Sequence, residues 1–162
     1  VGMGGIAVGG KVPEFTLKDQ NGKDQSFYKD ILPKGAALVV FYPGDFTMVC
    51  TKQLCSYRDN LDEFKNLGVQ VVGVSKNSTK DHESFSKEYG FNFSLLSDDK
   101  REVAKEFGTA SFLSIGGVSR AVFIVSQQGT VLYRHIEATN ILHRKSDELL
   151  KVIQDLKDQK QI

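Results

Sequence analysis

The stretch AALVVFYPGDFTMVCTKQLC, residues 36–55, decides the fold and places the chemistry. Its first seven residues are apolar without alternation, which predicts a strand buried on both faces at the centre of a sheet. Pro43 and Gly44 break the strand, and the pattern that follows is typical of a helix. Both cysteines of the chain, Cys50 and Cys55, lie at the start of this helix. Unpaired N–H groups and the helix dipole favour a thiolate there, so the stretch predicts a site of sulfur chemistry.

The segments around this stretch predict strands that alternate with helices. Residues 14–17 and 24–27 flank an Asp-Gln-Asn-Gly turn and predict an N-terminal β-hairpin. Apolar runs predict further strands over 69–75 and 121–125, with 131–133 pairing back on the last one. Helical spacing predicts one helix from the cysteines to Gly68 and an amphipathic helix near the C-terminus. We therefore expect an α/β fold with a central mixed sheet flanked by helices.

Length and composition favour a single domain over residues 11–162. The 162 residues are 40% hydrophobic and 25% charged, which is ordinary for a globular domain with a sizeable core. Five glycines in residues 1–10 predict a flexible tail before it. A net charge of +1 gives no electrostatic footprint for nucleic acid, and no apolar run approaches the length of a membrane span. Two cysteines do not make a disulfide framework, which leaves reactive thiols or a redox pair.

The positions of the two cysteines on the predicted helix differ. Cys50 precedes Leu54 by four residues and shares its apolar stripe, so it should face inward, whereas Cys55 lies about 100° away. Five helical residues rise about 7.5 Å and turn about 140°, which exceeds the Cα separation of roughly 7 Å that a disulfide tolerates. A Cys50–Cys55 disulfide therefore cannot form while the helix is intact. Each cysteine could also be a small packed side chain.

The pattern Pro43-x-x-x-Thr47-x-x-Cys50 resembles the active-site signature of the peroxiredoxins. FTLKDQNGK (15–23), CTKQLCSYRD (50–59) and LLSD (95–98) resemble the peroxiredoxin Q branch, also called the bacterioferritin comigratory protein branch, and most closely its plant chloroplast members. The resemblance extends from about Lys11 to the C-terminal helix. It implies a thioredoxin-like fold.

The resemblance also implies roles for individual residues. Cys50 would be the peroxidatic cysteine, attacking a hydroperoxide and becoming a sulfenic acid. Thr47 would offer its hydroxyl to the thiolate and the peroxide, and Pro43 would shield the thiolate. Arg120 falls at the position of the family's active-site arginine and would stabilise the thiolate and the leaving oxygen. Gln53 would support Arg120 or the loop without touching the reacting atoms.

The implied reaction is the reduction of hydrogen peroxide and organic hydroperoxides, in the service of cell redox homeostasis and antioxidant defence. Cys55 would be the resolving cysteine: the first turns of the helix would unwind, an intramolecular Cys50–Cys55 disulfide would form, and thioredoxin or a related dithiol would reduce it. No cofactor or metal is implied, and the branch favours a monomer. The plant-like motifs and a first residue that is not methionine favour a mature plastid (chloroplast) protein after transit-peptide removal, with a bacterial cytoplasm as the alternative.

One departure from the branch and several alternatives remain open. Met48-Val49 stand where peroxiredoxin Q proteins usually have Pro-Gly, which puts pocket shape and substrate preference in doubt. A one-cysteine peroxidase would leave Cys55 without a role. A thiol-disulfide oxidoreductase would normally show Cys-x-x-Cys, and a copper-delivery protein would favour Cys-x-x-x-Cys with a histidine. The three histidines, His82, His135 and His143, are interpreted as packing or surface residues rather than ligands.

Overall fold

A mixed sheet organises the chain, with strand order β2-β1-β5-β4-β3-β6-β7. The computed structural model describes residues 5–111, 117–137 and 143–162, so Gly2 and Gly4 of the predicted tail lie outside the described part. The strands are β1 (Thr16–Lys18), β2 (Asp24–Ser26), β3 (Ala36–Phe41), β4 (Val69–Ser75), β5 (Ser94–Ser97), β6 (Ala121–Val125) and β7 (Val131–Ile136). β3 pairs parallel to β4 and antiparallel to β6, which confirms a mixed sheet.

The apolar run at the start of the quoted stretch forms the central strand. All six residues of β3 are buried. Leu38 and Val40 point into one core, and Val39 and Phe41 point into the core on the other face. Two-sided burial explains why this strand shows no alternation of polar and apolar residues.

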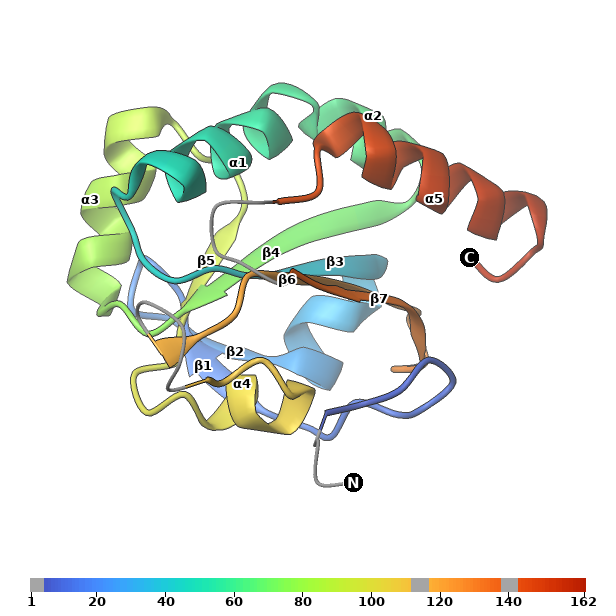
Figure 1. Ribbon diagram of the computed structural model, residues 1–162, viewed down its shortest axis with the longest axis horizontal. Coiled ribbons are helices and arrows are strands. Elements are labelled where there is room, and N and C mark those ends of the chain that lie inside the picture. The colour runs from blue at the N-terminus through green and yellow to red at the C-terminus, as the bar shows by residue number, and fades with distance from the viewer. Residues whose placement is uncertain (1–4, 112–116, 138–142) are drawn as a thin grey trace.

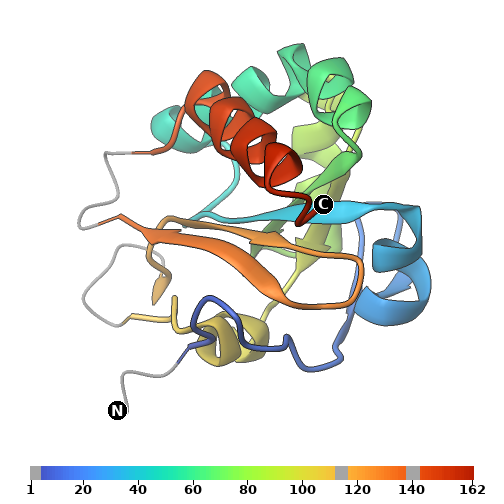
Figure 2. The ribbon, with the colours of Figure 1, turned by 90° about the vertical axis from the view of Figure 1, so that its right-hand side faces the viewer.

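Helices cover both faces of the sheet (Figures 1 and 2). Side chains of α1 (Met48–Asp59), α2 (Leu61–Asn66), α3 (Thr79–Tyr89) and α5 (Ser146–Asp158) pack in one core. On the opposite face lie α4 (Glu102–Phe107), a π-helical turn η1 (Phe27–Ile31) and a 3₁₀ turn η2 (Leu32–Lys34). The expected sheet flanked by helices is therefore confirmed.

The helix predicted to run from the cysteines to Gly68 is interrupted at Asn60. The backbone of Asn60 leaves helical geometry (φ −112°, ψ 17°), and its side-chain amide donates to the carbonyl of Ser56 at 2.9 Å. A side chain that binds the backbone in this way competes with helix continuation. The apolar spacing persists across the break, because Leu61 and Phe64 of α2 join the same core as Leu54. Gly68 follows the C-cap residue of α2 with φ +80°, as expected for that position.

The N-terminal hairpin forms as predicted, with β1 antiparallel to β2. Its turn is fixed by the Asp19 carboxylate, which accepts hydrogen bonds from the N–H groups of Asn21 and Lys23. Backbone hydrogen bonding to β7 begins slightly before the expected domain start at Lys11, since the Gly9 N–H donates to the Val131 carbonyl. Among the described residues, every helix is too short or too polar to cross a membrane.

Candidate active site

The turn after β3 delivers Cys50 to the beginning of α1. Pro43 is buried at the end of the strand, and Thr47 occupies the N-cap position with extended backbone (φ −72°, ψ 150°). Cys50 is the third residue of α1, and none of its surface is exposed. The prediction that Cys50 faces inward is therefore confirmed, and its thiol lies beside the N-terminal turn of a helix.

Strand register places Arg120 at this turn. β6 runs antiparallel to β3, and Phe41 at the end of β3 pairs with Ala121 at the start of β6. Arg120 directly precedes Ala121, so it lies beside the segment in which β3 turns toward α1. Its side chain is almost wholly buried. Two segments far apart in the sequence thus meet at one point.

Arg120 contacts the candidate nucleophile directly. Its Nη1 donates to Cys50 Sγ at 3.1 Å and to Gln53 Oε1 at 2.9 Å. The Gln53 amide donates in turn to the Tyr57 hydroxyl at 2.9 Å, and that hydroxyl donates to the Arg144 carbonyl at 3.2 Å. Cys50, Gln53 and Tyr57 occupy one buried face of α1. The guanidinium is therefore held by a hydrogen-bonded chain that ends on the segment before α5.

The Thr47 hydroxyl binds the backbone of its own loop. The residue is exposed, and its hydroxyl donates to the Gly44 carbonyl at 3.1 Å, without capping α1 by its side chain. Within the described residues, the hydroxyl thus binds its own loop, and its role toward thiolate and peroxide stays a prediction. The same holds for shielding of the thiolate by Pro43, although that proline is buried next to the turn.

Cys55 lies off the buried face of α1, as predicted, and it is half-buried. Both cysteines are free thiols on one continuous helix. Burial raises the pKa of the Cys55 thiol; the positive charge of Arg58 opposes this shift, and the negative charge of Asp59 adds to it. Cys55 is therefore kept in its protonated form more strongly than a free cysteine.

A buried polar network behind the loop was not predicted. Tyr42 donates its hydroxyl to Asp45 Oδ1 at 2.7 Å, and Asp45 Oδ2 lies 2.7 Å from His82 Nδ1. The other ring nitrogen of His82 lies 3.1 Å from the Leu96 carbonyl oxygen. His82 is fully buried on α3, so it is a packed residue as interpreted from the sequence, but its partner was missed. The pair spans 37 positions, and no local spacing signals it.

The other two histidines, His135 and His143, lie near Arg144, where the series of hydrogen bonds from Arg120 through Gln53 and Tyr57 ends. His135 contacts the Glu137 carboxylate at 2.9 Å and Arg144 at 3.1 Å. Burial lowers the pKa of His143, and the charge of Arg120 lowers it further. Within residues 5–111, 117–137 and 143–162, no three His, Cys, Asp or Glu side chains gather in a group that could hold a metal ion. The copper-delivery alternative gains no support from this arrangement.

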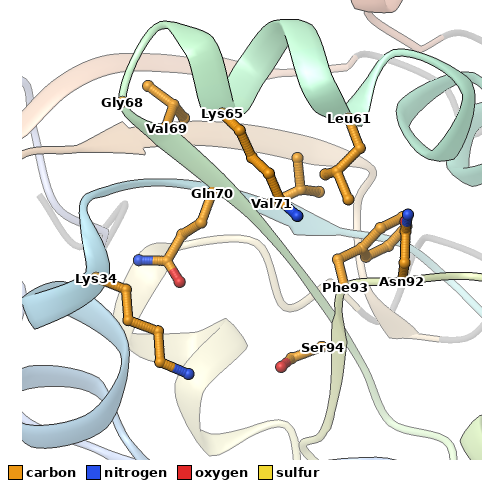
Figure 3. A pocket seen from close by; sticks show the side chains of 10 residues that line it. All are labelled: Lys34, Leu61, Lys65, Gly68, Val69, Gln70, Val71, Asn92, Phe93 and Ser94. Atoms are coloured by element: carbon orange, nitrogen blue, oxygen red, sulfur yellow. The ribbon is translucent and has the colours of Figure 1, made fainter.

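A separate groove of about 430 Å³ lies at the N-terminal ends of β4 and β5, two interior strands of the sheet (Figure 3). Lys34 and Lys65 approach it from η2 and α2, and Gln70 and Phe93 line it from β4 and the segment before β5. Its lining includes none of the candidate residues around Cys50. The groove is therefore not the place where a peroxide would meet the thiol.

Comparison with known proteins agrees with this geometry. The sequence model of the AhpC/TSA family matches residues 8–134. The chain is also 39% identical over 153 residues to a protein named peroxiredoxin Q, chloroplastic, from Sedum lineare, covering 94% of this chain and 80% of that protein. The chain belongs to the AhpC/TSA family of peroxiredoxins.

Solved structures of other peroxiredoxins share the fold of this peroxiredoxin. The peroxidoxin BcpB of Mycobacterium tuberculosis superposes with a TM-score of 0.83 at 28% identity, covering 93% of this chain and 98% of that one. Peroxiredoxin Q of Xanthomonas campestris superposes with a TM-score of 0.77 at 25% identity, covering 87% and 90% of the two chains. The peroxiredoxin Q resemblance and the thioredoxin-like fold expected from the sequence are thereby confirmed.

Proposed function

We propose that this peroxiredoxin reduces hydrogen peroxide and organic hydroperoxides at Cys50. The observation that supports this most strongly is the 3.1 Å hydrogen bond from Arg120 to Cys50 Sγ inside a buried site. A guanidinium keeps its positive charge under ordinary conditions, so it holds a permanent charged donor against that sulfur. The thiolate is the nucleophilic form of cysteine.

The first step is an attack of the Cys50 thiolate on one peroxide oxygen. A sulfur–oxygen bond forms, the oxygen–oxygen bond breaks, and the second oxygen leaves as water or an alcohol after taking up a proton. Cys50 becomes a sulfenic acid, which is the first rung of thiol oxidation. Arg120 stabilises the negative charge on the leaving oxygen, and Gln53 keeps the guanidinium aimed at the reaction. Thr47 and Pro43 complete the pocket in this proposal.

The second step joins Cys50 and Cys55. The Cys55 thiol attacks the sulfenic acid, a disulfide forms, and one water leaves. An intact α1 holds the two Cα atoms about 7.5 Å apart along its axis and turns their side chains about 140° from each other. The first turns of α1 must therefore unwind before the disulfide forms. Exposure of Cys55 during unwinding also removes the burial that raises its pKa, which helps to form the attacking thiolate.

The family resemblance also suggests how the disulfide is reduced and where the protein acts. Thioredoxin or a related dithiol would reduce the disulfide by exchange and restore both thiols. The protein would act as a monomer in redox homeostasis and antioxidant defence. A plastid location is supported by the Sedum lineare relative, whose name describes it as chloroplastic.

The test is peroxide-dependent NADPH oxidation with thioredoxin and thioredoxin reductase. We expect turnover in the wild type and its loss in both Cys50→Ser and Cys55→Ser. Full turnover of Cys55→Ser with a low-molecular-weight thiol would instead make the protein a one-cysteine peroxidase. No peroxide consumption by the reduced wild type would contradict the proposal.

A further inference from the structure

The loop between β3 and α1 contains a residue in an unfavourable backbone conformation. Phe46 has φ +64°, in the left-handed region that bulky side chains rarely adopt. Such a conformation persists only where surrounding contacts over-determine it. Phe46 lies directly before Thr47, the N-cap residue of α1. The loop that places Cys50 therefore needs to be held by its neighbours.

The loop lies beside α3 (Figure 1), and α3 and the segment before it supply most of the contacts that hold it. The Phe46 ring packs 4.9 Å, between ring centroids, from Phe85 on α3. The Asp45 N–H donates to Asn77 Oδ1 at 2.9 Å. Both carboxylate oxygens of Asp45 are also used, one by the Tyr42 hydroxyl and one by His82. The contact with His82 is shielded from solvent, because the His82 side chain has no exposed surface and the Asp45 side chain almost none.

Both ring nitrogens of His82 have a hydrogen-bond partner. Nε2 faces a carbonyl oxygen, which only accepts, so Nε2 must bear a proton. One further proton lies between Nδ1 and Asp45 Oδ2, because two acceptors would repel at 2.7 Å. His82 thereby connects the loop, through Asp45, to the backbone of β5 at Leu96.

We propose that His82 is a positioning residue for the reaction of Cys50 with peroxide. Through Asp45 it keeps the loop seated on α3, so that Pro43 and Thr47 stay beside the thiolate when the peroxide arrives. When α1 unwinds for the disulfide step, the loop remains on α3 and only the helix moves. This inference rests on the proposed peroxidase function, and it adds a residue that does not touch the reacting atoms.

Two amide substitutions separate the two contacts of the ring. In His82→Asn the side-chain amide can take the position of Nδ1 and still donate to Asp45, but it cannot reach the Leu96 carbonyl. In His82→Gln the longer side chain can reach the carbonyl with its amide and loses the contact with Asp45. Both variants replace the buried ring by a buried amide, so a role in packing alone predicts the same effect for both.

The experiment measures two rates in each reduced protein by rapid quenching and mass spectrometry: oxidation of Cys50 by hydrogen peroxide, and formation of the Cys50–Cys55 disulfide afterwards. We expect His82→Gln to slow the first rate about tenfold or more, since small displacements of positioning groups cost that much or more. His82→Asn should stay close to the wild type, and neither variant should slow the second rate. Equal first rates in the two variants, whether both slow or both like the wild type, would overturn the inference.

A second pair of variants covers the case in which the His82 variants do not fold. In Asp45→Asn the amide can donate to Nδ1 of a neutral His82 and its carbonyl can still accept from Tyr42, whereas Asp45→Ala removes both contacts. We expect the first rate to survive in Asp45→Asn and to fall in Asp45→Ala, and equal rates would again overturn the inference. Failure of the proposed function itself is recognised separately, because the wild type would then not react with peroxide at all.

Discussion

Arg120 donates a hydrogen bond to the sulfur of Cys50 across 70 positions of sequence. The contact exists because β6 runs antiparallel to β3, with Ala121 opposite Phe41. The residue before one strand therefore meets the turn after the other. This relationship joins the fold to the chemistry, since it places a permanent positive charge against a buried thiol.

Replacement of Arg120 tests the contribution of that charge. In Arg120→Met the sulfur loses its donor, and the leaving oxygen loses electrostatic stabilisation. We expect the rate constant of Cys50 oxidation by hydrogen peroxide to fall by about 10²–10³, as for the loss of an oxyanion-stabilising donor. Arg120→Lys should retain more of the rate because it keeps a charge. A rate for Arg120→Met within a few-fold of the wild type would contradict this role.

Gln53 should influence the rate through Arg120. It accepts from the guanidinium and donates to Tyr57, with no exposed surface. Gln53→Met leaves buried polar groups without these partners, which should lower the free energy of unfolding by about 1–3 kcal/mol. Cys50 oxidation should slow, but less than in Arg120→Met. Urea unfolding and rapid-quench kinetics measure the two effects.

Lys52 provides the matched control for Gln53. It is the neighbouring residue on α1, and its side chain is exposed. Lys52→Met introduces the same side chain one position away. Both quantities should remain near wild-type values in that variant, and equal effects of Lys52→Met and Gln53→Met would contradict the positioning of Arg120 by Gln53.

The pKa of Cys55 predicts the pH dependence of its labelling. Burial, opposed by Arg58 and reinforced by Asp59, raises this pKa, so the folded state favours the thiol. In a Cys50→Ser background, the rate of alkylation by iodoacetamide should rise with pH, and its midpoint should lie above that of the same protein unfolded in urea. The associated stabilisation is present below the pKa of the unfolded state and is lost as pH rises between the two values. A midpoint at or below that of the unfolded protein would contradict the raised pKa of Cys55 in the folded state.

Met48 should favour apolar peroxides. Among the described residues, Val8, Phe46 and Met48 are the large hydrophobic side chains that are exposed, and two of them flank Thr47. If an organic peroxide covers roughly 25–50 Å² of Met48, burial at ~25 cal/mol per Å² should raise its rate of reaction by a factor of about three to ten. Met48→Ser should therefore lower the ratio of cumene hydroperoxide to hydrogen peroxide rates by that factor. Val8→Ser is the control, and an unchanged ratio in Met48→Ser would contradict the prediction.

Much of the fold was predictable because its signals are local. The unbroken apolar run of β3, the turn that makes the N-terminal hairpin and the glycine after α2 each depend on neighbouring residues. The break at Asn60 was missed because the apolar spacing continues through it, while the cause is one side chain that binds the backbone.

The candidate site was predictable only in part. The position of Cys50 follows from helical spacing, but nothing local links Cys50 to Arg120; that expectation came from family resemblance. The Asp45–His82 pair was missed because its members lie on different elements and only the folded chain brings them together. Thr47, by contrast, was recognised from the motif. Its hydroxyl binds the Gly44 carbonyl in the structure, so its role toward the thiolate and the peroxide stays a prediction.

The most direct test is a single turnover of the fully reduced protein with one equivalent of hydrogen peroxide, read by intact and peptide mass spectrometry. We predict that the wild type loses two hydrogens and yields a peptide linked through Cys50 and Cys55. Cys55→Ser should gain one oxygen at Cys50, trapped as sulfenic acid, and Cys50→Ser should remain unchanged. Oxidation of Cys55 in the Cys50→Ser variant at the wild-type rate, or no reaction in the wild type, would contradict the assignment of Cys50 as the peroxidatic cysteine.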